Sequence, residues 1–312
     1  MEASRHEGRV LFFRFGVFPD GGPAVLIVFN PVAGRRRARR LWRVLDVLSA
    51  NGVRLEIAET AYPGHAGELA REAAREGADL VVAAGGDGTI TEVAGGLAGS
   101  DCRLGVIPLG TANVLAHELG LPEDAAGLAA CLAFGRTRLV WPGKAEGPGI
   151  QRLFVQMLGA GFDAQVVQRL PFALKRVLGR QAYVLQTLRE MARYPFPRIT
   201  IALDGQPYEV GSVIVTKGRF YAGPYVLAPG RDPGAPGLTV ALFEHANPAS
   251  VLTYGAGLLS GSLPHMPGLK LLAASRVELF TAGVPAQTDG EVAGLTPCVI
   301  TDAPRPIPIV VV

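Results

Sequence analysis

The sequence predicts an α/β protein in which a doubly wound parallel sheet is followed by a mostly antiparallel β domain. Hydrophobic residues make up 49% of the 312 residues, which suffices for a core and excludes a disordered chain. Short apolar runs alternate with amphipathic stretches from Ala24 to Phe134, and strand-like runs dominate after Gly135. We therefore expect an N-terminal extension over residues 1–23, a first domain over 24–135 and a second domain over 136–312.

Strands and helices alternate in the first domain, which predicts right-handed crossovers and helices on both faces of a parallel sheet. Four apolar runs are the expected buried strands: Val25–Phe29, Leu55–Ala58, Leu80–Ala84 and Arg103–Ile107. Apolar residues at helical spacing predict helices over Arg36–Ala50 and His65–Glu76. Two more helices are expected, one from Thr89 and one after Asn113.

The second domain is predicted to consist mainly of strands. The Asp204-Gly205 pair between two apolar runs indicates a hairpin, Gly143–Gly149 is expected to be a loop, and helices are predicted over Phe172–Arg193 and Pro248–Leu259. The expected strands are Phe154–Leu158, Ile199–Leu203, Glu209–Val215, Leu238–Phe243, Arg276–Phe280 and Ile307–Val312.

Charge and cysteine content narrow the class of protein. Lys and Arg exceed Asp and Glu by three, too few to indicate nucleic acid as a partner. Cys102, Cys131 and Cys298 lie far apart, which argues against disulfides and a thiolate metal site and suits a reducing cytosol. No apolar run approaches the roughly 20 residues that span a bilayer.

The strongest local motif is Gly85-Gly86-Asp87-Gly88-Thr89, between a buried strand and a helix. Glycines there let backbone N–H groups approach an anion, and a helix N-terminus favours negative charge. A carboxylate in such a loop repels phosphate directly, so Asp87 is expected to hold Mg²⁺ or to orient a nucleotide hydroxyl. The alternative is a tight turn in which Asp87 caps the helix.

Six ordered motifs resemble the catalytic domain of the diacylglycerol kinase and sphingosine kinase family, specifically its bacterial soluble lipid kinases. The resemblance implies a nucleotide-binding first domain, a C-terminal β-sandwich and an active site between them. The motifs cover nearly everything from Ala24 onward: Asn30–Gly34, Gly85–Thr89, Pro108–Asn113, Gly161–Ala164, Tyr221–Gly223 with Leu227–Pro229, and Asp289–Glu291.

By the same resemblance, ATP and Mg²⁺ are the expected cofactors, with Asp87 and Glu291 on the metal and Asp289 accepting the proton of the substrate hydroxyl. Asp163 either binds the lipid head group or caps the following helix, and His65 either lines the nucleotide or is only a first-turn helix residue. The residues expected around ATP are Asn30, Gly34, Thr60, His65, Gly85, Gly86, Asp87, Gly88, Thr89, Gly110, Thr111 and Asn113.

Two positions depart from the family pattern. Val114 stands where many relatives carry Asp, which removes a polar group near the nucleotide. Bacterial members bind a structural metal through an Asp-Gly-Leu turn, whereas this chain reads Pro236-Gly237-Leu238. The resemblance therefore leaves a structural metal in question.

These motifs predict a kinase for the hydroxyl of diacylglycerol or a related lipid, and leave sphingoid or ceramide-type lipids, NAD, and a non-catalytic binding protein as alternatives. Docking is expected to be peripheral, from the cytoplasm, on a membrane surface, and a homodimer stays open. The cations expected to attract the membrane are Arg35–Arg40 and, within Phe172–Met191, Lys175, Arg176, Arg180 and Arg189. Arg35–Arg40 is otherwise a solvated helix face.

Overall fold

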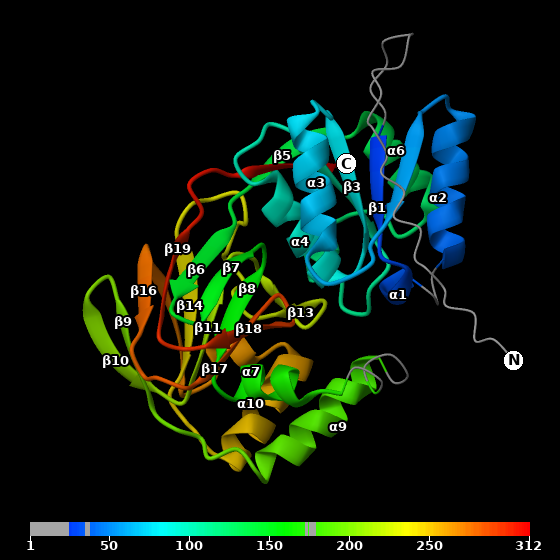
Figure 1. The fold of residues 1–312 in the computed structure, drawn as a ribbon. Coiled ribbons are helices and arrows are strands. Elements are labelled where there is room, and N and C mark those ends of the chain that lie inside the picture. Colours follow the sequence, from blue (N-terminus) through cyan, green and yellow to red (C-terminus); the bar gives the residue numbers. More distant parts are fainter. Residues whose placement is uncertain (1–24, 35–37, 172–173, 175–178) are drawn as a thin grey trace, which may run out of the picture.

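The computed structural model describes residues 25–34, 38–171, 174 and 179–312. Figure 1 shows a first sheet flanked by helices and, beside it, a second part built mainly of strands. This arrangement confirms the predicted α/β fold class.

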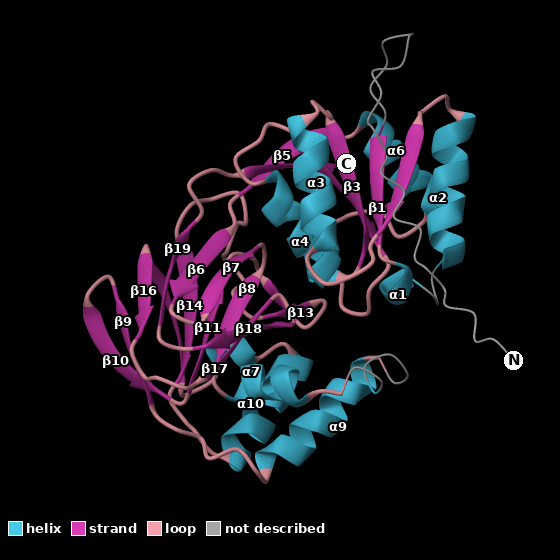
Figure 2. Ribbon diagram, in the orientation of Figure 1, coloured by secondary structure: helices cyan, strands magenta, loops and turns pink. Residues whose placement is uncertain are grey.

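The first sheet has the order β2-β1-β3-β4-β20-β5. Its parallel strands β1 (Val25–Phe29), β2 (Leu55–Glu59), β3 (Leu80–Gly85) and β4 (Arg103–Pro108) match the predicted runs closely. Every residue of β3 is buried, because helices cover both faces of a doubly wound sheet. The helices of this part are α1 Pro31–Gly34, α2 Ala38–Ala50, α3 His65–Arg75, α4 Asp87–Leu97, α5 Val114–Glu118 and α6 Ala125–Phe134. Helix α3 packs against α4, and α2 packs against α6 (Figure 2).

The C-terminal strand differs from the sequence prediction. We expected Ile307–Val312 among the strands of the second part, but β20 (Ile307–Val311) lies in the first sheet between β4 and β5 (Arg136–Val140). Figure 1 shows the red C-terminal strand returning to the blue and cyan sheet. An apolar strand carries no information about which sheet it joins, so only the tertiary fold assigns it.

The second part is a β-sandwich of two six-stranded antiparallel sheets, ordered β10-β9-β16-β19-β6-β7 and β15-β14-β11-β8-β17-β18. Apolar side chains from both inner faces form its core. The strands are β6 Gly143–Gly147, β7 Ile150–Phe154, β8 Met157–Ala160, β9 Ile199–Leu203, β10 Gln206–Val210, β11 Ser212–Thr216, β14 Leu238–Phe243, β15 Leu269–Ala274, β16 Arg276–Leu279, β17 Pro285–Thr288, β18 Glu291–Leu295 and β19 Cys298–Asp302, with a separate ribbon of β12 Phe220–Tyr221 and β13 Tyr225–Val226.

The predicted hairpin is confirmed, because Asp204 and Gly205 join β9 to β10 with φ of 48° and 85°, both in the left-handed region that such two-residue turns require. The predicted loop over Gly143–Gly149 is wrong, since β6 pairs with β7 and β19. Gly143 serves packing there: a Cβ on it would lie 2.1 Å from Cζ of Phe154.

Two predicted strands each divide into two. Phe154–Leu158 separates into the end of β7 and the start of β8, which belong to different sheets. Glu209–Val215 likewise separates into β10 and β11. A chain that crosses between the two layers keeps its apolar pattern, so the pattern alone hides the break.

The remaining helices are α7 (Phe162–Arg169), α9 (Arg180–Met191), α10 (Pro248–Ser260) and the short turn η1 (Leu263–His265). A capping box between Asn247 and Ser250 begins α10. Part of the predicted helix over Phe172–Arg193 lies outside the described residues. Over the described ranges, no helix has the length and hydropathy that a bilayer crossing requires.

Candidate active site

The carboxyl ends of β1 and β3 meet at the glycine motif. Gly85 ends β3, Asp87 begins α4, and the Asn30 side chain at the end of β1 donates from Nδ2 to Oγ1 of Thr89 at 3.0 Å. A Cβ on Gly85 would lie 2.5 Å from the same Thr89 oxygen, so glycine is required there. Parallel strands place their carboxyl ends at one edge, which is where open α/β sheets bind ligands.

A second loop, between β4 and α5, packs on the first at a glycine–glycine contact. A Cβ on Gly110 would lie 2.6 Å from Cα of Gly86 and 2.8 Å from Oδ1 of Asn113. Asn113 adopts a left-handed φ of 49° and is buried, and among the residues that the structure describes its Oδ1 has no hydrogen-bond partner. Thr111, in contrast, is exposed on the same loop. The structure thus brings the motifs Gly85–Thr89 and Pro108–Asn113 together.

Asp87 joins the two loops. Its Oδ2 accepts from the backbone N of Asn113 at 2.8 Å and its Oδ1 from that of Val114 at 2.7 Å, at the first turn of α5. Burial raises the pKa of Asp87 to about 6, and the backbone N–H groups oppose this shift. Both carboxylate oxygens therefore bind backbone in this structure, an arrangement that the sequence suggested only for α4.

Other residues expected around ATP occupy the rim of this edge. Thr60 follows β2 and its N donates to Phe29 O at 2.9 Å, and Gly34 ends α1. His65 accepts from the N of Ala61 through Nδ1 at 3.1 Å and stacks on Tyr62 with ring centroids 4.6 Å apart.

The N-terminus of α3 already has an anionic partner. Glu92 of α4 accepts from the backbone N of Gly64 at 2.8 Å and of Ala66 at 3.3 Å. A carboxylate at this helix N-terminus satisfies donors that would otherwise be unpaired. The backbone N–H groups of Gly64 and Ala66 therefore already have an acceptor in this structure.

Asp289 lies in the second part of the chain and contacts the first. Its Oδ1 accepts from the N of Gln156 at 2.9 Å and of Met157 at 2.8 Å, and its Oδ2 from the N of Val155 at 2.8 Å and Oγ1 of Thr91 at 2.6 Å. Thr91 belongs to α4, two residues beyond the glycine motif. Burial raises the pKa of Asp289, and these four donors oppose the shift.

Glu291 reaches the glycine motif from β18. A Cβ on Gly88 would lie 3.1 Å from Cγ and 3.3 Å from Oε1 of Glu291. The Asp-Gly-Glu turn therefore covers the start of α4, with Asp289 on Thr91 and Glu291 on Gly88. Asp289 has a left-handed φ of 49° and Gly290 has one of 81°. This turn directs the carboxylates of Asp289 and Glu291 toward the domain that contains the first sheet.

Asp163 at the first turn of α7 is engaged inside the second part. Its Oδ1 accepts from the hydroxyl of Tyr221 and its Oδ2 from Nε2 of Gln287 at 2.9 Å. The Oε1 of Gln287 accepts from the N of Gly290 at 2.8 Å. Burial raises the pKa of Asp163. A continuous chain of hydrogen bonds therefore leads from Tyr221 to the Asp289-Gly290 turn.

The arginine run is only partly within the described residues, since 35–37 lie outside them. Arg40 donates to the carbonyl of Pro122 at 3.0 Å and that of Pro108 at 3.4 Å, and so braces the end of β4. Lys175 and Arg176 of the predicted amphipathic stretch also lie outside the described residues.

Sequence reasoning missed Thr91 and Glu118, which join the two parts, and Gln287, which acts within the second part. Thr91 lies two residues after the motif Gly85–Thr89, and Gln287 lies two residues before Asp289–Glu291. This proximity is the sequence signal that could have indicated them. Glu118 of α5 is 3% exposed and accepts from the N of Arg219 at 2.7 Å and from its Nε at 3.0 Å. A buried glutamate of this kind carries no recognisable sequence signal.

A metal ion at this edge would need ligands from the bound nucleotide in addition to those of the protein. Within the described ranges, no three His, Cys, Asp or Glu side chains gather closely enough to hold a metal ion. Mg²⁺ at phosphoryl-transfer sites is typically held by one or two carboxylates, phosphate oxygens and water. Glu291, against the glycine motif, is a carboxylate that suits this donor set.

Glycine loops at the carboxyl edge of a parallel sheet, faced by a buried carboxylate from a β-sandwich, define a phosphotransferase that acts on an alcohol group. Residues 24–145 match the family model "Diacylglycerol kinase catalytic domain". Residues 156–311 match "YegS C-terminal NAD kinase beta sandwich-like domain".

Known proteins agree with these matches. The chain is 31% identical over 278 residues to "Diacylglycerol kinase" of Bacillus subtilis strain 168, which covers 87% of this chain and 90% of that protein. It is 30% identical over 230 residues to the Staphylococcus haemolyticus protein of the same name, covering 72% of this chain and 68% of the other. The chain belongs to the diacylglycerol kinase family.

Solved structures share the fold. A crystal structure of a protein described as a putative diacylglycerol kinase, from Bacillus anthracis strain Sterne, superposes with a TM-score of 0.75 at 24% identity. The superposition covers 93% of this chain and 95% of the other.

Proposed function

We propose that this lipid kinase transfers the γ-phosphoryl group of ATP, with Mg²⁺, to the hydroxyl of diacylglycerol or a closely related lipid. The observation that carries the proposal is the buried Asp289 carboxylate, which is bound by three backbone N–H groups of the β-sandwich and by Thr91 beside the glycine motif. This position joins a proton acceptor to a phosphate-binding loop.

The phosphates are proposed to lie on the two glycine loops, Gly85–Thr89 and Gly110–Asn113. Gly86 packs closely on Gly110, which brings the two loops together at the edge where the N-terminus of α4 favours negative charge. The orphaned Oδ1 of Asn113 is an acceptor that a nucleotide hydroxyl or amine would satisfy. Asp87 acts as a positioning residue, since its two bonds to α5 fix the second loop.

Asp289 is the proposed general base. Three backbone donors hold the carboxylate in place, while the Thr91 hydroxyl is a side-chain donor that a substrate hydroxyl can replace on Oδ2. The alcohol oxygen forms a bond to the γ-phosphorus, the bond from that phosphorus to the bridging oxygen breaks, and ADP leaves. The alcohol proton passes to Asp289, and a pKa raised by burial favours this acceptance near neutral pH.

Glu291 is the proposed protein ligand of Mg²⁺, which supplies neutralisation of charge on the transferring phosphoryl group. Its contact with Gly88 keeps the carboxylate against the glycine motif. Asp163 is proposed to act on the acceptor side by holding Gln287 and thereby the turn that presents Asp289.

A parallel transfer assay tests the proposal. The full chain is incubated with γ-labelled ATP and Mg²⁺, and the acceptor is diacylglycerol, a sphingoid base, ceramide or NAD in separate arms. Labelled phosphatidic acid is the expected main product, and Asp289→Asn should lower its rate of formation by about 10² to 10⁴. Transfer mainly to NAD, or to none of the acceptors, would contradict the proposed function.

The same proposal places the enzyme on an anionic membrane surface, since its acceptor resides in a bilayer. An open cavity of about 650 Å³ between α7 and α9 is lined by Arg169, Arg189 and Arg193. The acid beside them, Glu190, accepts from Gln165 at 3.0 Å and Gln186 at 2.8 Å instead. Within the described part of the chain, no hydrogen bond or ion pair engages the three guanidinium groups.

Sedimentation with vesicles tests this docking. Arg169→Gln with Arg193→Gln should reduce binding to phosphatidylglycerol vesicles, and added salt should reduce binding of the wild type, because each basic residue near an anionic surface contributes about 1 kcal/mol. Arg75→Gln, which removes an exposed arginine at the end of α3, is the control. Equal binding to phosphatidylcholine vesicles, insensitive to salt, would contradict electrostatic docking.

A further inference from the structure

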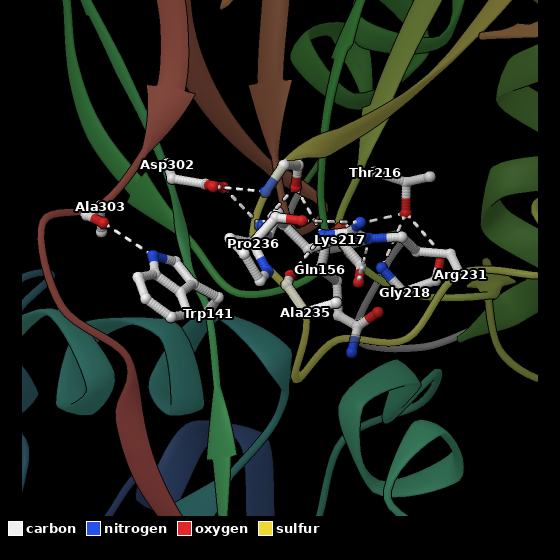
Figure 3. Close-up of polar contacts among 11 residues, drawn as sticks. Trp141, Gln156, Thr216, Lys217, Gly218, Arg231, Ala235, Pro236, Asp302 and Ala303 are labelled. Carbon is white, nitrogen blue, oxygen red and sulfur yellow. Dashed lines mark hydrogen bonds and ion pairs between the residues drawn. The ribbon is translucent and has the colours of Figure 1, made fainter. Parts of the chain in front are cut away.

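Lys217 is a fully buried lysine that follows β11, with a side chain 0% exposed. Its Nζ donates to the carbonyl of Gly237 at 2.7 Å and to Oδ1 of Asp302 at 2.5 Å (Figure 3). The Oδ2 of Asp302 accepts from the N of Gly237 at 2.5 Å. The ammonium group therefore closes a ring that joins β11, the turn before β14 and the end of β19.

A second cation binds the same turn. Arg231 donates from Nη2 to the carbonyl of Ala235 at 2.7 Å and that of Gly237 at 2.5 Å. It also donates from Nη1 to Pro236 O and from Nε to Lys217 O, both at 3.3 Å. Converging carbonyls and a carboxylate are the ligands that hard cations prefer. In this chain, side-chain cations occupy that environment.

A structural divalent metal does not fit here. The family resemblance places the metal-binding carboxylate at the position of Pro236, and proline offers only a carbonyl. Lys217 and Arg231 place two positive charges against the single carboxylate of Asp302, and the neighbouring Asp232 is already paired with Arg138 at 2.7 Å. A divalent ion would face net repulsion at short range.

We propose that the Lys217 ammonium takes the place of a bound cation, so that this chain holds its β-sandwich together at Gly237 and Asp302 without a structural divalent metal. The inference is independent of the proposed acceptor and of the catalytic Mg²⁺. It concerns a junction of the fold: next to Asp302, Ala303 donates to Pro142 O at 2.9 Å and accepts from Nε1 of Trp141 at 2.8 Å. Here the chain crosses between the two parts (Figure 3).

The ring also supports the segment that binds Asp289. The backbone N of Lys217 donates to Gln156 O at 2.7 Å, and the N of Gln156 donates to Asp289 Oδ1 at 2.9 Å. Lys217 is therefore a positioning residue two hydrogen bonds from the proposed base.

Thermal unfolding of the nucleotide-free full chain tests the inference. The wild-type Tm should be the same in EDTA and in millimolar MgCl₂, and Lys217→Met should lower it by about 5 °C or more, since removing one partner leaves a poorly compensated charge. Lys144→Met is the control, because the ion pair of Lys144 with Glu146 is exposed and such pairs contribute little. An unchanged Tm for Lys217→Met would overturn the proposal.

A reciprocal variant tests whether the ammonium stands in a cation position. Lys217→Ala combined with Pro236→Asp removes the ammonium and adds a carboxylate, so its Tm should rise with MgCl₂ or CaCl₂. A double variant insensitive to both salts would contradict the substitution of metal by lysine. A Mg²⁺-dependent rise in the wild-type Tm that persists in Glu291→Gln would contradict it as well, because that metal would lie outside the proposed catalytic site.

Discussion

Replacement of Asp289 by asparagine should cost both stability and turnover. The carboxylate accepts four hydrogen bonds, from the N of Val155, Gln156 and Met157 and from Thr91. Asparagine has one acceptor oxygen, which best serves the two donors on Oδ1. The amide NH₂ group of the asparagine then faces the backbone N–H of Val155, and two donors cannot bond each other. The Thr91 hydroxyl can rotate and accept a hydrogen bond from the same NH₂ group. One buried N–H is left unpaired, which costs about 1–3 kcal/mol.

Two measurements check this expectation. Urea unfolding should show a free energy of unfolding lower by that amount, and initial rates of phosphoryl transfer should fall by about 10² to 10⁴, the scale for loss of a general base. Thr91→Val is the control, since the carboxylate keeps its three backbone donors and remains able to accept a proton. A wild-type rate in Asp289→Asn would refute the base assignment, and wild-type stability would refute the reasoning from the four-donor cradle.

Two further results are expected. Gly88→Ala should lower turnover with little loss of stability, because the new Cβ would lie 3.1 Å from Cγ of Glu291 and would displace that side chain. Kinetics and thermal unfolding together check this expectation, and an unchanged rate would argue against Glu291 as the metal ligand. Gln287→Leu should lower the free energy of unfolding by about 1–3 kcal/mol, because it leaves Oδ2 of the buried Asp163 without its donor and the N–H of Gly290 without its acceptor, while Tyr221 still donates to Oδ1. The same stability as the wild type would show that this chain of hydrogen bonds contributes little energy.

The local pattern predicted the regular elements of the first half well. The runs at Val25–Phe29, Leu55–Ala58 and Leu80–Ala84 are strands in the structure because a strand buried on both faces is apolar throughout, and that property is visible locally. Turn chemistry was also visible: Asp204-Gly205 tolerates the left-handed conformation that its hairpin needs. Glycines used for packing, such as Gly143, misled the same reasoning because they resemble turn glycines in sequence.

By itself, the sequence determined the fold class, the family and the segments that meet at the candidate site, because ordered motifs at strand ends survive as local features. Only the tertiary structure decided which partners each side chain takes. Asp87 binds the first turn of α5, Asp163 holds Gln287, and Lys217 fills a ring of carbonyls and carboxylate 20 and 85 residues away in sequence. Hydrogen bonds and burial depend on distance in space. Residues so far apart in sequence are brought together only when the strands and helices pack into the tertiary fold.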